Sequence, residues 1–249
     1  MSLHRKSRKY HKWLMLFVGA QLLVWSITGA YMVVMDIHYI HGDSLVANKQ
    51  KAIDFEDVKY SLRQLMTDHG EAKDVELGLL LSQTVYRFND GEQHVMVSAL
   101  DGLQISPIDE TLAISIAKDN YTNTNAVITQ AQLIIVNPPR ELSGRHLPAW
   151  RIDFDDFASP SFYISANSGK LVTKRHSYWR VFDWMFAFHV MDYIDEEADN
   201  KLLLFFTVLA FIASIFGLVL TYNRLMPQQS KRNRNFDSKL NKGVVDEKA

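Results

Sequence analysis

The chain of 249 residues contains no cysteine. This absence excludes disulfide bonds, thiolate metal sites and a cysteine nucleophile. The sequence also lacks a phosphate-binding loop and a glycine-rich dinucleotide motif, which argues against nucleotide chemistry. Its formal net charge is only −1, so the overall charge does not favour a nucleic-acid partner. Hydrophobic residues make up 47% of the chain, which is sufficient for a buried core.

Two long segments lack charged side chains. Residues 13–35 and 202–222 contain no Asp, Glu, Lys or Arg. A helix rises about 1.5 Å per residue, so either segment is long enough to cross a hydrocarbon core of roughly 30 Å. The sequence therefore predicts transmembrane helices over residues 13–35 and 201–223. A cleaved signal peptide is the alternative for the first segment, but the apolar run is too long and no small-residue cleavage motif follows Met35.

Basic residues are concentrated at the two ends of the chain. Residues 1–12 carry five basic residues and no acid, and basic residues again outnumber acids after Asn223. Lys and Arg next to a membrane span stay in the cytoplasm. We therefore expect a basic cytoplasmic N-terminus (1–12), a disordered cytoplasmic tail (224–249) and a region outside the cytoplasm (36–200). The lipid bilayer is then the first partner of the chain.

Small residues recur four positions apart in both apolar segments, which is the spacing that lets membrane helices approach closely. The pairs are Ser26 with Ala30, Ala210 with Ser214, and Ala213 with Gly217. Small residues are common in any membrane span, so the pattern leaves open whether the two helices pack together.

The segment between the spans is predicted to be α+β, with a helix followed by antiparallel strands occurring twice, in residues 53–108 and 109–175. The first half has a helix period over Asp54–His69 and strand-like runs at Val75–Ser82, Thr84–Asn89 and His94–Leu100. The second half has a helix over Asp109–Tyr121 and strands at Val127–Val136, Trp150–Phe154, Phe162–Ser165 and Lys170–Lys174. The expected core residues are Leu62, Leu65, Ile116, Trp150 and Ile152.

The two halves also share short motifs. Tyr86-Arg87 in the first half and Trp150-Arg151 in the second each place an aromatic residue before an arginine. Each half then has a strand and a turn, at Asp101-Gly102 and at Ser168-Gly169. An internal repeat of this kind predicts two similar units packed as one body.

These residues resemble the PepSY domain, a small helix-plus-sheet module of bacterial envelope proteins. The resemblance is best over residues 147–175, and the flanks at Tyr10–Leu14, Thr28-Gly29 and 186–193 are similar to those of PepSY-associated transmembrane proteins. It extends over nearly the whole chain up to about Pro227. It implies a two-pass protein of the bacterial inner membrane with a periplasmic domain. The implied function is an interaction or regulatory module that modulates a protease or another envelope protein.

Larger proteins of this type have four spans and several intramembrane histidines, and some resemble haem-dependent reductases of iron–siderophore complexes. This chain has two apolar segments and no histidine in either. An accessory or electron-transfer subunit of such a reductase, with haem, is therefore the alternative function. An orphan structural membrane protein is the third.

Three histidines next to the predicted spans are the candidate ligands for haem or a metal. They are His38, His41 and His189. Imidazole groups at such spacing can ligate a metal or haem, but interfacial histidines also serve as amphipathic anchors. Asp153, Asp155 and Asp156 form an acidic cluster that an exposed strand end explains more simply than a cation site. No catalytic residue is predicted, and an enzyme is not favoured.

Residues 178–193 combine many aromatic side chains with few charges. Trp179, Phe182, Phe186 and His189 fall on one helical stripe. We expect an amphipathic helix lying in the outer membrane interface, with Phe182 and Phe186 towards lipid or the first span and Asp183 towards water. The alternative is a core helix of the outer domain.

Overall fold

The computed structural model describes residues 3–47, 52–91, 93–192 and 200–225. The chain divides into two compact units, which are described one at a time. The helical unit comprises residues 1–32 and 185–249, and the α+β body comprises Val33–Trp184. The predicted class is confirmed, because the body contains two antiparallel sheets and the helical unit contains two long apolar helices.

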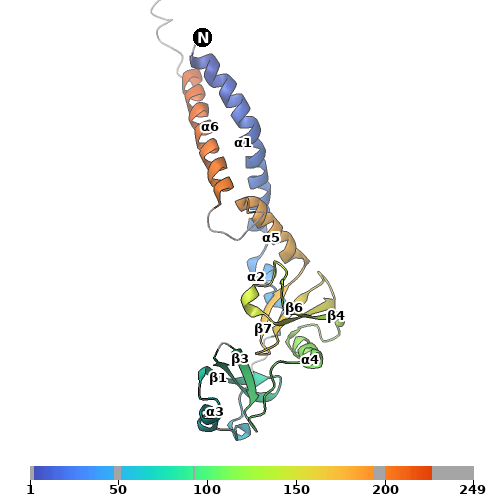
Figure 1. The fold of residues 1–249 in the computed structure, drawn as a ribbon. Coiled ribbons are helices and arrows are strands. Elements are labelled where there is room, and N and C mark those ends of the chain that lie inside the picture. Colours follow the sequence, from blue (N-terminus) through green and yellow to red (C-terminus); the bar gives the residue numbers. More distant parts are fainter. Residues whose placement is uncertain (1–2, 48–51, 92, 193–199, 226–249) are drawn as a thin grey trace, which may run out of the picture. The chain divides into compact units, whose positions relative to one another are not determined.

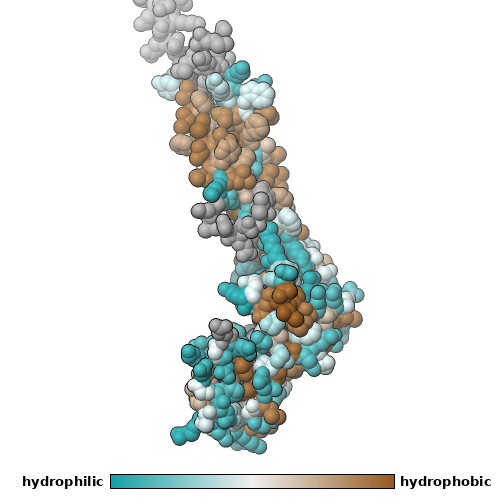
Figure 2. Space-filling model, viewed as in Figure 1, coloured by the Kyte–Doolittle hydropathy of each residue, from teal (hydrophilic) through white to brown (hydrophobic). Residues whose placement is uncertain are grey.

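The helical unit is built on α1 (Leu3–Val34) and α6 (Lys201–Leu225) (Figure 1). Within them, Lys9–Val34 and Lys201–Tyr222 are long and apolar enough to cross a membrane. Hydrophobic colour covers most of the visible surface of these two helices in Figure 2. The predicted spans 13–35 and 201–223 coincide with these helices, apart from Met35, which follows the end of α1.

Within the helical unit, small residues of α6 lie in its contact with α1. Val18 of α1 and Ala213 of α6 are each 1% exposed. A Cβ atom added to Gly217 would lie 3.2 Å from the His11 ring, so glycine permits this approach. Ser26 and Ala30 are exposed. The Ala213–Gly217 pair therefore lies in the helix contact, whereas the predicted pair on α1 does not.

The first half of the body contains α3 (Leu62–Asp68) and a three-stranded antiparallel sheet (Figure 1). Its strands are β1 (Ala72–Leu80), β2 (Gln83–Asp90) and β3 (Gln93–Ser98), paired in this order. Leu65 on α3 is fully buried among side chains from one face of the sheet, including Tyr86 and Phe88. The helix therefore covers this face.

The first predicted helix is too long. The segment from Asp54 forms only a 3-10 turn, Phe55–Asp57, and α3 begins after Ser61. A capping box fixes this start, because the Ser61 hydroxyl accepts the Gln64 N–H and the Gln64 side chain accepts the Ser61 N–H. Leu62 is 51% exposed, so the prediction that it belongs to the core is wrong, whereas Leu65 is confirmed.

The second half contains α4 (Glu110–Asn120) and a four-stranded antiparallel sheet. Its strands follow chain order and are β4 (Val127–Ile134), β5 (Ala149–Asp155), β6 (Ser161–Ser165) and β7 (Leu171–Arg175). The predicted helix Asp109–Tyr121 is α4 with its two caps, since Asp109 is the N-cap, accepting the Leu112 N–H, and Tyr121 is the C-cap. The body also contains three short elements: α2 (Ile37–Ile40) and the 3-10 turns Asp43–Leu45 and Gly144–His146.

The two halves share one hydrophobic core. Val85 and Met96 from the first sheet join Ile116 from α4 and Ile152 and Phe162 from the second sheet. Burial of this common core joins the halves into one body. The predictions for Ile116 and Ile152 are confirmed. Trp150 is only half-buried, and its indole N–H donates to the Ile108 carbonyl at 3.0 Å.

The two predicted turns have matching hydrogen bonds. Gly102 N–H donates to the Ser98 carbonyl, and Gly169 N–H donates to the Ser165 carbonyl, each at 2.9 Å. Both glycines have positive φ, at 77° and 64°. The chain then pairs Gln104 with Val97 in the first half and Leu171 with Ile164 in the second. The first half thus has a single bridge where the second half has strand β7.

Candidate functional site: the cleft between the halves of the body

The turn between β6 and β7 packs closely against the first half. A Cβ atom on Gly169 would lie 2.6 Å from the Leu80 side chain, and the residue has a positive φ of 64°. Both observations favour glycine, since any side chain there meets steric conflict and backbone strain. This close approach brings Ser168 and Lys170 to β1 and β2.

Arg87 on β2 joins the two halves. Its Nε donates to the Ser168 carbonyl at 2.6 Å, and its Nη2 donates to the Leu79 carbonyl at 3.0 Å. The side chain is buried, and burial lowers the pKa of Arg87, while the charge of Glu76 partly offsets that effect. Hydrogen bonds from a buried guanidinium to backbone carbonyls are strong and directional, so Arg87 fixes the β6–β7 turn on the first sheet.

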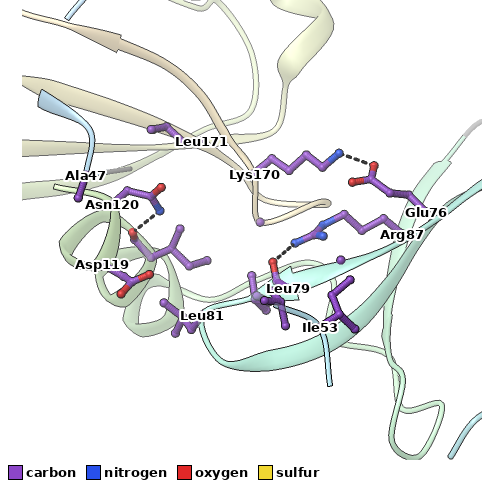
Figure 3. A pocket seen from close by; sticks show the side chains of 14 residues that line it. Ala47, Ile53, Glu76, Leu79, Leu81, Arg87, Asp119, Asn120, Lys170 and Leu171 are labelled. Carbon is purple, nitrogen blue, oxygen red and sulfur yellow. Dashed lines mark hydrogen bonds and ion pairs between the residues drawn. The ribbon is translucent and has the colours of Figure 1, made fainter. Parts of the chain in front are cut away.

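A cleft of about 500 Å³ opens beside this arginine (Figure 3). Glu76 and Lys170 form an ion pair across it, one from each half of the body. Asp119 and Asn120 at the end of α4 also line it. The remaining surface is apolar and is formed by Ala47, Ile53, Leu79, Leu80, Leu81, Ile116 and Leu171. The cleft thus presents charges of both signs beside an apolar surface.

A second cleft, of about 380 Å³, shares Glu76, Arg87 and Lys170 with the first. It extends towards His94 and His146. Burial, together with the charge of Arg145, lowers the pKa of His146. The two clefts therefore adjoin at the junction of the halves, where Glu76 and Lys170 line both.

The residues that line the first cleft are suited to binding. Carboxylate, ammonium and guanidinium groups lie there beside apolar side chains. Together these groups can hold a short peptide segment by charge pairing and burial.

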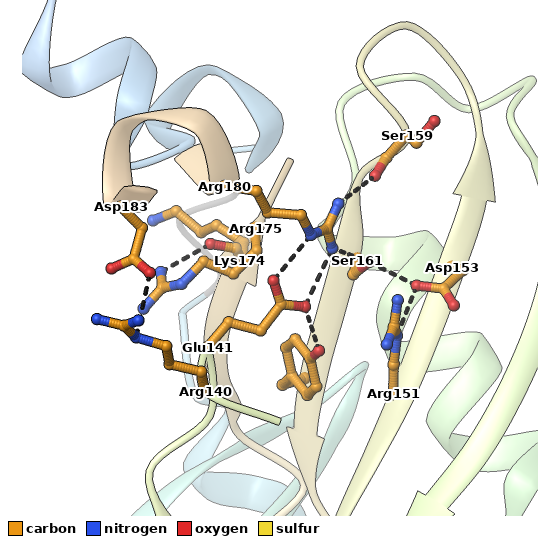
Figure 4. Close-up of polar contacts among 11 residues, drawn as sticks. Arg140, Glu141, Arg151, Asp153, Ser159, Ser161, Lys174, Arg175, Arg180 and Asp183 are labelled. Atoms are coloured by element: carbon orange, nitrogen blue, oxygen red, sulfur yellow. Dashed lines mark hydrogen bonds and ion pairs between the residues drawn. The ribbon is translucent and has the colours of Figure 1, made fainter. Parts of the chain in front are cut away.

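A second polar group of residues links the first turns of α5 (Ser177–Val190) to the second sheet and to the loop after β4 (Figure 4). Arg180 forms two hydrogen bonds with the Glu141 carboxylate, at 2.8 and 3.0 Å. Tyr163 also donates to Glu141, and Arg180 donates to Ser161 at 2.8 Å. Glu141 lies in the loop that follows β4, so this network joins three separate segments of the body.

The network is electrostatically balanced around Glu141. Burial raises the pKa of this carboxyl, but hydrogen bonds from Arg180 and Tyr163 outweigh burial, and the pKa is lowered overall. Burial and the hydrogen bond to Glu141 raise the pKa of Tyr163. The side chain of Glu141 is only 9% exposed, and these contacts stabilise its charged form there. Its role is therefore structural.

The predicted helix over residues 178–193 is α5, which ends at Val190; Tyr193 lies outside the described residues. Its first turns pack on the body through Arg180. Asp183, expected to face water, is 3.5 Å from the Arg140 guanidinium, and its side chain is 28% exposed. Phe186 is 50% exposed. No residue of Ser177–Trp184 is buried, so this part of α5 is not a core helix of the body, and its last residues belong to the helical unit. The interfacial position stays a prediction.

The three histidines predicted to ligate haem or a metal fall in different units. His38 and His41 lie on and after α2 in the body, and both are exposed. His38 Nδ1 is 3.2 Å from Asp43 Oδ2. His189 belongs to the helical unit, where its Nδ1 is 3.0 Å from the Thr28 hydroxyl. Each of the two nitrogens thus has a protein partner, and a common site for the three histidines stays a prediction.

Carboxylates and imidazoles do not gather into a metal site in the part of the chain that the structure describes. Asp153 accepts hydrogen bonds from Arg151 and Ser161, and Asp156 accepts from Tyr121 and Asn123. These two carboxylates of the predicted acidic cluster therefore serve separate structural contacts.

Sequence analysis missed Glu141 and Arg180, and it did not identify the cleft. Glu141 lies in a segment predicted only as a loop, and no local pattern shows that a loop acid meets a helix arginine 39 residues later. Arg87 was noted as part of a repeat, without its role between the halves. No family model, curated protein or solved structure matches the chain.

Proposed function

We propose that the chain is a membrane-anchored, PepSY-like module whose body binds a polypeptide of the bacterial envelope in the periplasm. The two long apolar helices and the basic residues beside them support membrane anchoring with both termini in the cytoplasm. The repeated turn geometry and the Tyr86-Arg87 and Trp150-Arg151 motifs support the PepSY likeness. Under this proposal the partner is an envelope protein, such as a protease that the module modulates.

The observation that carries the proposal is the cleft at the junction of the halves. It contains an ion pair, three further polar or charged side chains (Arg87, Asp119 and Asn120) and an apolar surface. Such a surface recognises an extended peptide by burying apolar side chains and pairing with charged ones. This chemistry supports regulation by peptide binding.

Site-specific photo-crosslinking in native membranes tests the proposal. A photoreactive amino acid at Leu79, which lines the cleft, is compared with the same group at Thr67 on α3, outside it. We expect a defined adduct from position 79 only. Lys170→Glu should weaken the adduct because it places two acids opposite each other. Combining Lys170→Glu with Glu76→Lys restores the ion pair with its charges exchanged. Recovery of the adduct would show that the partner needs the ion pair, and no recovery that it needs each charge in its original place. Identical adducts from both positions would contradict binding in the cleft.

The haem alternative depends on His189, because this is the histidine of the described helical unit that contacts α1 near Thr28. His11 lies 17 residues earlier on α1, which corresponds to about 25 Å along the helix. His11 and His189 are therefore too far apart to ligate the same haem. A Soret band in the purified protein that disappears in His189→Ala would support the alternative, and its absence after haem supplementation would reject it.

A further inference from the structure

The outer edge of the second sheet is unpaired. The strand order leaves β4 bonded to β5 on one side only. On its other side, no segment among the described residues forms a strand pair or a backbone hydrogen bond with Val127–Ile134. The outward N–H and C=O groups of such an edge can pair with a further strand.

This edge also lacks the charged side chains that the other outer strands have. β1 carries charged residues, including Glu76, and β7 carries Lys174 and Arg175. The outer side of β3 is bonded to the segment after it, through Ser98 and Met96. By contrast, residues 127–136 contain no charge, proline or glycine. Charges on an edge strand prevent pairing with other chains, and β4 has none.

The sequence of the edge is nearly the same in both directions about Ala131. Residues 128–134 read Ile-Thr-Gln-Ala-Gln-Leu-Ile, so only Thr129 and Leu133 break the symmetry. We propose that two copies of the chain pair β4 with β4, antiparallel and centred on Ala131, to make one continuous sheet. Gln130 then lies opposite the partner's Gln132, and each copy contributes the same surface.

The partner strand is β4 of a second copy, because two identical strands can pair about a two-fold axis only if their sequence is self-complementary, and that of β4 is. An uncharged strand meets an identical strand without repulsion, and neighbouring glutamines can exchange hydrogen bonds across the axis. Exposed apolar side chains flank the centre, with Val127 and Ile135 each 63% exposed. The irregular pairing of β4 with β5 lies between Ile128 and Gln130 and so outside the three central residues.

A charge-exchange experiment on the full chain in lipid nanodiscs tests the proposal. Gln130→Lys with Gln132→Lys places lysines opposite lysines, and we expect dimerisation at least about tenfold weaker than that of the unaltered chain. The corresponding double Glu variant should behave alike, while a mixture of the two should form heterodimers. Gln93→Lys with Thr67→Lys adds the same charge elsewhere and should leave the dimer intact.

Cysteine pairing then checks the register, since the chain has no native cysteine. Opposite residues in an antiparallel pair have Cα atoms about 4.5–5.5 Å apart, which suits a disulfide. A mixture of Gln130→Cys and Gln132→Cys chains should oxidise mainly to the mixed disulfide. A monomeric unaltered chain, a dimer insensitive to the lysines, or β4 occupied by a different protein would each overturn the proposal.

Discussion

Arg87 and Arg151 occupy corresponding places in the two halves of the body, each after an aromatic residue on a central strand. Arg87 is buried and donates to two backbone carbonyls, one of them in the other half. Arg151 is partly exposed and pairs with Asp153 at 2.9 Å on its own strand. The arginine of this aromatic-arginine motif thus joins the halves in one case and forms an ion pair on its own strand in the other.

The difference between the halves follows from what packs on each sheet. The first sheet receives the β6–β7 turn, whose close approach at Gly169 leaves backbone carbonyls for Arg87 to bind. At the second sheet, Arg180 of α5 and Glu141 of the loop after β4 pair with each other, and Arg151 pairs with Asp153 of its own strand. A repeated unit can therefore keep its strand pattern while its arginine takes a new partner.

Removing Glu141 should have the largest effect. Glu141→Ala leaves Arg180 and Tyr163 without their acceptor, and we expect a loss of about 3–5 kcal/mol in the free energy of unfolding of the body. Hydrogen–deuterium exchange in β5 and β6 of the full chain in detergent measures this change. Normal protection in the variant would show that the network adds no stability.

The same network makes stability depend on pH. The pKa of Glu141 is lowered in the folded body, so its contribution is fully present above the usual range of a free glutamate, near 4.5. It is lost as pH falls through the lower folded pKa. Exchange protection measured between pH 7 and pH 3 should therefore fall more in the original chain than in Glu141→Gln, which carries no titrating group there.

Replacing the two arginines sharpens the comparison between the halves. Arg87→Met should cost about 2–3 kcal/mol because two charge-assisted hydrogen bonds are lost in a buried site. Arg151→Met should cost about 1 kcal/mol or less, because its ion pair is partly exposed. Equal exchange profiles for the two variants would contradict the different roles assigned to them.

Gly169→Ala tests the close contact between the two halves and should have a smaller effect on stability. We expect a loss of about 1–2 kcal/mol from backbone strain and contact with Leu80. Gly91→Ala is the matched control, because Gly91 has a similar positive φ but no atom closer than 4.0 Å to the added Cβ. Thermal unfolding of both variants separates the contact from the strain, and equal losses would mean that the contact is negligible.

The ion pair in the cleft should contribute least to stability. Lys170 and Glu76 are about half exposed, with side chains at 49% and 52%. Lys170→Gln should therefore change the free energy of unfolding by less than about 1 kcal/mol. The same variant is useful for binding studies because its fold should be intact, and a large loss of exchange protection would refute this expectation.

The elements of the body were predictable because their patterns are local. Strand alternation, the apolar spacing of the second helix and the two glycine turns are visible within a few residues, and the sequence predicts each of them. The long helix from Asp54 was wrong because apolar spacing alone could not show that Ser61 starts the helix. Leu62 was wrong for the same reason.

The contacts between segments were not predictable in this way. Arg87 reaches Ser168, and Glu141 reaches Arg180, only after the chain has folded. No periodicity records which partner a charged side chain will meet. The cleft depends on these distant pairings, so no local pattern shows that its residues share one site.

Side-specific labelling tests the central claim, that the α+β body lies outside the cytoplasm and both termini lie inside. The chain has no cysteine, so Thr124→Cys in the body, Ser7→Cys and Ser238→Cys provide single sites for a membrane-impermeant maleimide in intact spheroplasts. We predict labelling of position 124 alone, with positions 7 and 238 labelled only after the membrane is permeabilised. Labelling of all three positions in intact spheroplasts, or of the termini alone, would contradict the account.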